Sequence, residues 1–323
     1  MNRILAGAVA ATVMAMTTGA IAQTKWDLPA AYPAGNFHTT NLQKFADGVK
    51  AASGGKLEIT VHANGSLYKA PEIKRAVQSG QAQIGEVLMV NLQNEDAAFG
   101  ADGVPFLATS YADAKKLAAA QIPVVEKKLA GQGIALLYSC PWPPQGIYAK
   151  KDLNSVADME GLKWRAYSPA TSRLAELVKA QPVTIQAAEL SQALATGKVD
   201  SFVSSGATGV DSKVWEQLTH FYDTQAWLPK NMVIVNKAAW DKLDKAAKDA
   251  VAAEGKKAEA ACWAESEKLA GGFLETLAKN GMKVQKPNAK FASDLAGIGK
   301  TMTDEWVKNA GADGQAILDA YKK

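Results

Sequence analysis

Histidine and cysteine, the side chains most used for proton transfer and metal binding, are scarce in this sequence. Its 323 residues include three histidines, at positions 38, 62 and 220, and two cysteines. The motifs H-E-x-x-H, G-x-S-x-G and G-x-G-x-x-G are absent, as is a complete phosphate-binding loop with its lysine. An enzyme needs a nucleophile with a base, a metal cluster or a cofactor loop. We therefore expect no catalytic residues, no metal site and no cofactor.

The sequence also lacks a large excess of charge of either sign. The 36 Lys and Arg residues against 32 Asp and Glu residues give a formal charge of +4, which does not suggest a nucleic-acid partner. Hydrophobic residues make up 48% and charged residues 21%, an ordinary globular composition. After the N-terminus no segment holds 18 consecutive apolar residues, so we expect a folded, soluble chain without a membrane span.

The N-terminus has the order of a secretory signal peptide. Arg3 precedes a short apolar run at residues 4–16, and Ala20-Ile21-Ala22 supplies a small-residue cleavage site before Gln23. The run is too short to span a membrane, and no Cys follows the site to carry a lipid. We expect residues 1–22 to be removed and the mature chain to be periplasmic, with a length that suits about two domains of roughly 150 residues each.

Cys140 and Cys262 are both in the expected mature chain. An exported compartment allows them to form a disulfide. Two buried free thiols are the alternative, and the sequence does not decide between them. A C-x-x-C redox motif is absent.

The first part of the mature chain alternates between strand and helix patterns. Residues 57, 59 and 61 are apolar in strict alternation, which is typical of a half-buried strand, while Pro71 and Gly80 bound an amphipathic helix. The expected order is strand 26–30, a helix ending before 54–55, strand 57–61, helix 71–80, strand 82–88, a loop over 91–107 and helix 111–130. This β-α-β-α-β order predicts a sheet layered with helices.

A second α/β unit follows a proline-rich segment at residues 141–144, where we expect the chain to change domain. Ser168 and Pro169 are a good N-cap and first residue for a helix. The expected elements are strands 134–139, 147–149, 162–166, 183–185, 199–203 and 232–235, helices 169–178 and 188–195, a long helix 245–279, strand 282–285 and helix 289–309. The long helix could bend or break at Gly255 or at 271–272.

Arginine is rare, and one position is distinctive. After the signal peptide the only arginines are Arg75, Arg165 and Arg173, and the first and last lie on predicted amphipathic helices. Arg165 instead stands near the end of a predicted strand, before a turn and a helix. Ligands in α/β sheets collect at the carboxyl ends of strands, and a guanidinium can hold a carboxylate through two parallel hydrogen bonds. A structural ion pair is the alternative role.

Five motifs, in this order, resemble the solute-binding proteins of tripartite ATP-independent periplasmic (TRAP) transporters. They are residues 55–59 with 64–67, 77–85, 105–107, Met159 to Arg165, and Glu189 with 193–200. The resemblance covers the mature chain and implies an α/β fold of two domains, a ligand cleft between them and a long helix crossing both. It implies domain I at 23–145 with a segment returning around 230–280, domain II at 146–229, and a cross-over strand and C-terminal helices at 230–323.

The resemblance also implies a function and a site. In such proteins the arginine matching Arg165 binds the ligand's carboxylate, and a membrane permease driven by an ion gradient receives the ligand. Gln145 stands where many relatives place a second arginine, which favours a monocarboxylate. Further candidate ligand-binding residues are Ser204 and Ser205, the aromatics Trp142, Trp164 and Trp227, and, more weakly, Phe37, His38, Glu86 and Asn231.

We therefore predict an exported binding protein for a small organic acid. The sequence leaves open whether this is an aromatic acid, a 2-oxo or 2-hydroxy acid, or a sugar acid. A binding protein of an ABC transporter, which shares the closure of two domains, is the second hypothesis. A secreted lyase or hydrolase with Glu86 or His38 as base is the third.

Overall fold

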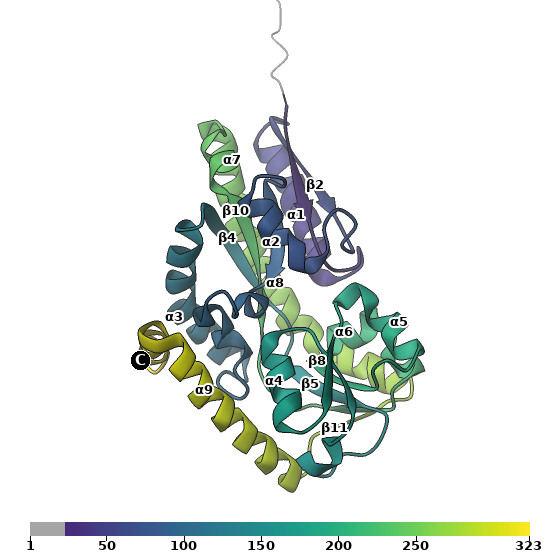
Figure 1. Cartoon of the computed structure of the whole chain (residues 1–323). Coiled ribbons are helices and arrows are strands. Elements are labelled where there is room, and N and C mark those ends of the chain that lie inside the picture. Colours follow the sequence, from purple (N-terminus) through teal and green to yellow (C-terminus); the bar gives the residue numbers. More distant parts are fainter. Residues whose placement is uncertain (1–22) are drawn as a thin grey trace, which may run out of the picture.

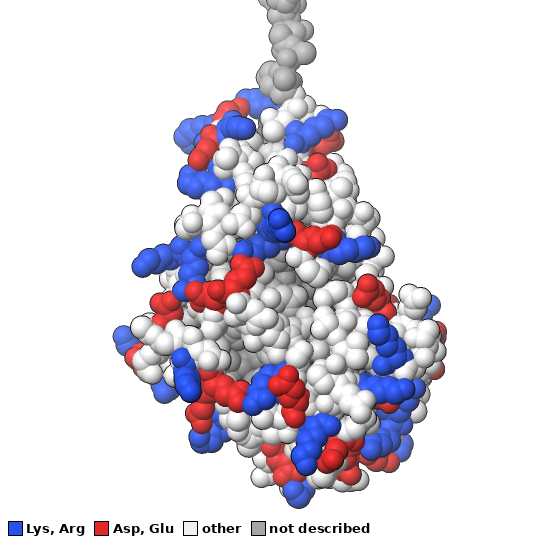
Figure 2. Space-filling model, viewed as in Figure 1, with Lys and Arg blue, Asp and Glu red and all other residues white. Residues whose placement is uncertain are grey.

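The structure, a computed structural model, describes residues 23–323, and the expected signal peptide lies outside them. Its strands form three sheets that divide between two lobes (Figure 1). A two-stranded and a three-stranded sheet form the first lobe, and a six-stranded sheet forms the second lobe. Figure 2 shows that positive and negative side chains are interspersed over this face of both lobes.

The first lobe is built from distant parts of the chain. β1 (Thr24–Pro29) pairs in parallel with β2 (Leu57–His62), and β10 (Lys230–Asn236) lies antiparallel between β3 (Ile84–Leu88) and β4 (Ile134–Pro141). Every residue of β10 is buried, which explains its central run of four apolar residues. The late strand thus completes a sheet begun by the first 90 residues.

The helices of the first lobe begin at recognisable caps. They are α1 (Phe37–Ala52), α2 (Ala70–Gln78), α3 (Tyr111–Ala130) and α7 (Lys237–Asp241). The Asn36 side chain accepts from the His38 amide at the start of α1, and Ser110 caps α3 in the same way. Leu42, Phe45 and Val49 form the buried face of α1, as the sequence predicts.

One expectation for this lobe is wrong. Residues 91–107 are not simply a loop, because they hold most of two 3-10 helices, η1 (Met89–Leu92) and η2 (Ala97–Gly103). The segment is also largely buried, with Phe99 fully inside the core. Its helical turns are too short to show an amphipathic period, which explains why the pattern indicates only a loop.

In the second lobe, the sheet has the order β11-β9-β5-β8-β6-β7. Its strands are β5 (Gln145–Ala149), β6 (Lys163–Ala166), β7 (Gln181–Thr184), β8 (Ser201–Ser205), β9 (His220–Tyr222) and β11 (Lys283–Gln285). β6 is parallel to both of its neighbours, so its carboxyl end opens toward loops and helix starts. The helices are α4 (Pro169–Leu177), α5 (Leu190–Ala195) and α6 (Gly206–Asp211), with short turns η3 (Val156–Met159), η4 (Ala187–Glu189) and η5 (Val214–Glu216).

Two long helices connect the lobes. α8 (Lys245–Lys279) packs on α1 and β4 of the first lobe and on α6 and β11 of the second (Figure 1). It is continuous through Gly255 and residues 271–272, where the sequence allows a break. Helix α9 (Ala289–Tyr321) consists of two helices that meet at a kink at Gly311, where φ is 55°, so the first of them ends close to the predicted residue 309.

A disulfide joins Cys140, at the end of β4, to Cys262 on α8, with Cα atoms 5.6 Å apart. Of the two alternatives that the sequence left open, a disulfide and two free thiols, the structure therefore has the disulfide. Among residues 23–323 no helix is long and apolar enough to cross a membrane.

A buried ion pair lies where the chain returns to the first lobe. Lys230, the first residue of β10, and Asp102 of η2 are both fully enclosed, with Nζ 3.2 Å from Oδ2. The same Oδ2 accepts a hydrogen bond from the Lys230 amide at 2.7 Å. The pair therefore fixes η2 against the start of β10.

Candidate functional site

A cavity that is partly open to solvent lies between the two lobes. Loops and strand ends of both lobes line it. The first lobe contributes Ala31, Tyr32, Ala70, Glu86, Val87, Leu88, Asn91, Trp142 and Pro229, and the second contributes Gln145, Arg165, Tyr167, Gln186, Ala187, Ser204 and Thr208. The only charged side chains among these residues are Glu86 and Arg165, one from each lobe.

Arg165 lies at the carboxyl end of β6 and is 3% exposed. Its Nε donates to the carbonyl of Ile185 at 2.8 Å, and its guanidinium carbon lies 5.0 Å from the ring centre of Tyr167. Within residues 23–323 no carboxylate lies within ion-pair distance of it, in contrast with Arg173, which pairs with Glu176 and Glu305. Main chain and aromatic rings therefore hold Arg165, which lines the cavity.

Burial has an electrostatic cost at this position. Removal from water lowers the pKa of Arg165 to about 10, only partly opposed by nearby Tyr167 and Tyr32. The guanidinium is still charged at neutral pH. An anion bound in the cavity would compensate this unpaired charge.

The facing wall of the first lobe is a polar network around Glu86. Glu86 is 3% exposed, and its Oε1 lies 3.4 Å from Nδ1 of His38. Its Oε2 is buried and has no hydrogen-bond partner in the part of the chain that the structure describes. Asn231 accepts hydrogen bonds from the Trp142 indole at 3.0 Å and from the Tyr32 hydroxyl at 3.3 Å. The network therefore fixes the wall and leaves one carboxylate oxygen free.

Asn91 supplies a second free acceptor, because its buried Oδ1 also has no partner. Opposite it, Gln145 is held at both ends, since its amide donates to the Pro143 carbonyl and its oxygen accepts from the Tyr167 hydroxyl. The residues that line the cavity thus include one cation and two residues, Glu86 and Asn91, that each have a buried oxygen without a hydrogen-bond partner within residues 23–323. Such a site suits a small ligand that carries both a carboxylate and a donor group.

The eleven candidate residues fall into three places. Five line the cavity: Glu86, Trp142, Gln145, Arg165 and Ser204. Phe37, His38 and Asn231 stand directly behind the first-lobe wall, around Trp142. Trp164 and Trp227 are packed in the hydrophobic core of the second lobe, and Ser205 caps α6. Of these, Trp227 still acts on the site, because its indole donates to the Tyr167 hydroxyl at 3.3 Å.

Sequence reasoning missed Tyr32, Asn91, Tyr167 and Gln186. Tyr167 had a signal, since it follows Arg165 by two residues and alternation along a strand places both on one face. No sequence signal pointed to Asn91, because it belongs to the segment expected to be a loop.

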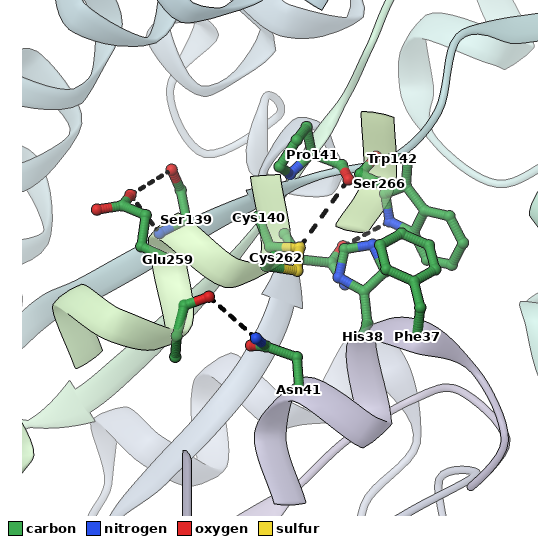
Figure 3. The surroundings of a disulfide bond; sticks show 12 residues. Phe37, His38, Asn41, Ser139, Cys140, Pro141, Trp142, Glu259, Cys262 and Ser266 are labelled. Atoms are coloured by element: carbon green, nitrogen blue, oxygen red, sulfur yellow. Dashed lines mark hydrogen bonds between the residues drawn. A yellow bond between two sulfur atoms is a disulfide. The ribbon is translucent and has the colours of Figure 1, made fainter. Parts of the chain in front are cut away.

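The disulfide supports the first-lobe wall from behind (Figure 3). His38, Phe37 and Trp142 stand beside Cys140 and Cys262, and the His38 ring is 4.2 Å from the Trp142 ring between centres. A nitrogen of His38 and both sulfurs lie within 4.8 Å of one another. Because the sulfurs are bonded to each other they are not thiolates, the form that binds metals.

These features define a two-lobed binding protein with its ligand site between the lobes. Residues 30–309 match the family described as bacterial extracellular solute-binding protein, family 7, and the chain belongs to that family.

The chain is similar to three solved structures of such proteins. DctP6 of Bordetella pertussis, an extracytoplasmic solute receptor binding pyroglutamic acid, is 58% identical over 93% of this chain and 99% of its own, with a TM-score of 0.91. A marine metagenome TRAP protein in complex with co-purified pyroglutamate is 50% identical over 93% and 99%, with a TM-score of 0.92. DctP7 of Bordetella pertussis, also binding pyroglutamic acid, is 47% identical over 93% and 100%, with a TM-score of 0.92. The predictions of fold and of a TRAP-type solute-binding protein are confirmed.

Proposed function

We propose that this protein is the receptor of a TRAP transporter for pyroglutamate or a closely similar cyclic monocarboxylate, which it delivers to the membrane permease. One observation carries the proposal: Arg165 is buried in the cavity wall, and no carboxylate of residues 23–323 pairs with it. A ligand carboxylate is the group that would complete it. Three similar proteins, 47–58% identical, bind pyroglutamate.

The remaining polar groups fit the rest of that ligand. Pyroglutamate is a five-membered lactam that adds an N–H donor and a carbonyl acceptor to its carboxylate. Glu86 Oε2 and Asn91 Oδ1 offer unpartnered oxygens for the N–H. The apolar surface of Trp142 and Leu88 would contact the ring methylenes. A ligand with a second carboxylate, such as glutamate, would place that carboxylate near Glu86, where like charges repel, and not near a cation.

The two lobes supply opposite ends of this site, so we infer that ligand binding closes them and excludes water. Exclusion of water strengthens the bond between Arg165 and the carboxylate. The signal-peptide pattern at residues 1–22 supports delivery of the chain to the periplasm.

A ligand panel tests the proposal. The mature protein is screened by thermal shift, then by calorimetry, against pyroglutamate, L-proline, L-glutamate and D-glucuronate. We expect the largest rise in melting temperature with pyroglutamate, because a tight ligand stabilises the folded state by mass action. In Arg165→Ala this rise should disappear. A larger shift with glucuronate, or an unchanged affinity in Arg165→Ala, would reject the proposal.

A further inference from the structure

The ring carbonyl of a lactam loses its water when the ligand is buried, so a hydrogen-bond donor of the cavity has to replace that water. Ser204 and Thr208 line the cavity with hydroxyls, which rotate to donate or to accept and so do not select one kind of group. Gln186 is half-buried. Gln145 differs from these three, because it is 2% exposed and both ends of its amide are bound within the protein.

The direction of each hydrogen bond around the Gln145 side chain follows from the residue types. The indole of Trp227 can only donate, and it donates to the Tyr167 hydroxyl at 3.3 Å. The hydroxyl in turn donates its own proton to the Gln145 oxygen, 3.1 Å away. The Pro143 carbonyl, which can only accept, takes an N–H of Gln145 at 3.0 Å. The network therefore assigns which end of this amide is oxygen and which is nitrogen.

The main chain of Gln145 is bound to the segment that carries Trp227. Its amide donates to the Trp227 carbonyl at 3.0 Å, and its carbonyl accepts from the Ala226 amide at 2.9 Å. Burial raises the pKa of the Tyr167 hydroxyl above its ordinary value, so the hydroxyl keeps the proton that it donates. Gln145 is therefore fixed in both position and orientation.

This orientation leaves Gln145 with an unused donor. Its nitrogen carries two hydrogens, and the Pro143 carbonyl takes one of them. Within residues 23–323 no second acceptor bonds to this nitrogen, whereas the oxygen of the amide already accepts from Tyr167. Because Gln145 lines the cavity, an acceptor oxygen of a ligand is the group that would complete its hydrogen bonds.

We propose that Gln145 selects a ligand with a ring carbonyl by donating its unused N–H to that oxygen, and that Tyr167 and Trp227 are positioning residues that hold the amide in this orientation. The inference rests on the proposed function and divides the ligand among three contacts. Arg165 binds the carboxylate, Gln145 binds the ring carbonyl, and the unpartnered oxygens of the first lobe accept from the ring N–H. A ligand without the carbonyl leaves the Gln145 N–H buried and unpaired, which weakens binding.

Two analogues that differ only in the ring carbonyl test the role of Gln145. They are 3-oxocyclopentanecarboxylate and cyclopentanecarboxylate, which both have a five-membered ring and a carboxylate and both lack the ring N–H. Their affinities are measured by displacement of pyroglutamate in isothermal titration. We expect the wild-type protein to bind the oxo compound at least about tenfold more tightly than the other analogue.

The variant Gln145→Met keeps the length of the side chain and has no donor. The two analogues should bind it within about twofold of each other, and its affinity for pyroglutamate should be about tenfold below that of the wild type. The melting temperature of the ligand-free variant shows whether it folds.

Tyr167→Phe tests the positioning role, because it removes the hydroxyl and keeps the ring beside Arg165. The preference for the oxo compound should fall to about threefold. In the double variant with Gln145→Met the preference should equal that of Gln145→Met alone, since both changes act on one contact. A purely structural role of the hydroxyl would lower the melting temperature and leave the preference between the analogues unchanged.

Two buried tryptophans of the same core supply a matched comparison. Trp227→Phe should give a preference between those of the wild type and Tyr167→Phe, because Pro143 still holds the Gln145 nitrogen. Trp164 is also fully buried, but its indole N–H has no partner within residues 23–323. Trp164→Phe should therefore keep the wild-type preference.

Three results would count against these assignments. If the wild type does not prefer the oxo compound, or if the preference survives in Gln145→Met, the role of Gln145 is overturned and the proposed function still stands. An equal loss of preference in Trp164→Phe and Trp227→Phe would reject the positioning role, because core packing alone would then explain it. Absence of pyroglutamate binding in the wild type would reject the proposed function itself.

Discussion

Two of the buried cations of this protein, Lys230 and Arg165, have opposite surroundings. Lys230 is fully enclosed and faces Asp102, with Nζ 3.2 Å from the carboxylate. Arg165 is enclosed to nearly the same degree, yet its partners are a main-chain carbonyl and aromatic rings. A buried charge needs compensation in either case. The protein supplies it for Lys230 through Asp102, whereas for Arg165 we propose that the ligand carboxylate supplies it.

The largest expected effect comes from breaking the compensated pair. Asp102→Ala leaves the Lys230 charge buried without a partner, which should cost about 3–5 kcal/mol in the free energy of unfolding. Urea unfolding followed by circular dichroism measures this loss. The double variant Asp102→Leu with Lys230→Met removes both charges and should recover most of the stability. A loss below about 1 kcal/mol in Asp102→Ala would contradict a structural role for the pair.

Removal of the Arg165 charge should weaken ligand binding and leave the stability of the fold nearly unchanged. Arg165→Met keeps an apolar side chain of similar length, so packing against Tyr167 is largely retained. We expect pyroglutamate affinity to fall at least about 30-fold, about 2 kcal/mol. The free energy of unfolding of the ligand-free protein should stay within about 1 kcal/mol of wild type. If Arg165→Met lost binding free energy and folding stability to a similar extent, Arg165 would be a structural cation like Lys230.

Replacement of Arg165 by lysine separates the effect of its charge from the effect of its hydrogen-bonding geometry. Arg165→Lys retains the charge and loses the planar fork that holds a carboxylate with two hydrogen bonds. Affinity for pyroglutamate should fall about tenfold, equal to about 1.4 kcal/mol, in isothermal titration. Lysine at wild-type affinity would show that charge alone, without fork geometry, holds the ligand.

The smallest effect is a pH dependence at the alkaline end. Because burial lowers the pKa of Arg165 to about 10, half of the guanidinium is neutral at that pH and affinity should fall about twofold. Isothermal titration with pyroglutamate from pH 8 to 10.5 measures this fall. In the ligand-free protein the unfolded state holds more protons at this pH, so the contribution of Arg165 to stability should rise through the same range. An affinity that does not change up to pH 10.5 would contradict the lowered pKa.

Much of the fold could be predicted from the sequence because its signals are local. Helix 111–130 and the long helix 245–279 have the predicted ends, since Ser110 and Asp244 cap their N-termini with side-chain hydrogen bonds. The helix after residue 289 ends at the kink at Gly311, close to the predicted end at residue 309, and the second helix that follows was not predicted.

The candidate site was less predictable. Arg165 stood out because arginine is rare in this chain and strand ends in α/β sheets bind ligands. Trp142, Trp164 and Trp227 have no such local distinction. Only the packing of the lobes places Trp142 at the cavity and the other two in the core of the second lobe. Each side chain would be buried either way, so its residue type could not separate the two roles.

The sequence by itself determined the alternation of strands and helices, the family motifs and the single arginine at a strand end, because each of these is written in neighbouring residues. The tertiary structure decided what surrounds each buried charge. It brought Asp102 to Lys230 across 128 positions, joined Cys140 to Cys262, and set Glu86 and Arg165 on opposite walls of one cavity. Compensation of a charge depends on distance in space, and only the folded chain fixes that distance.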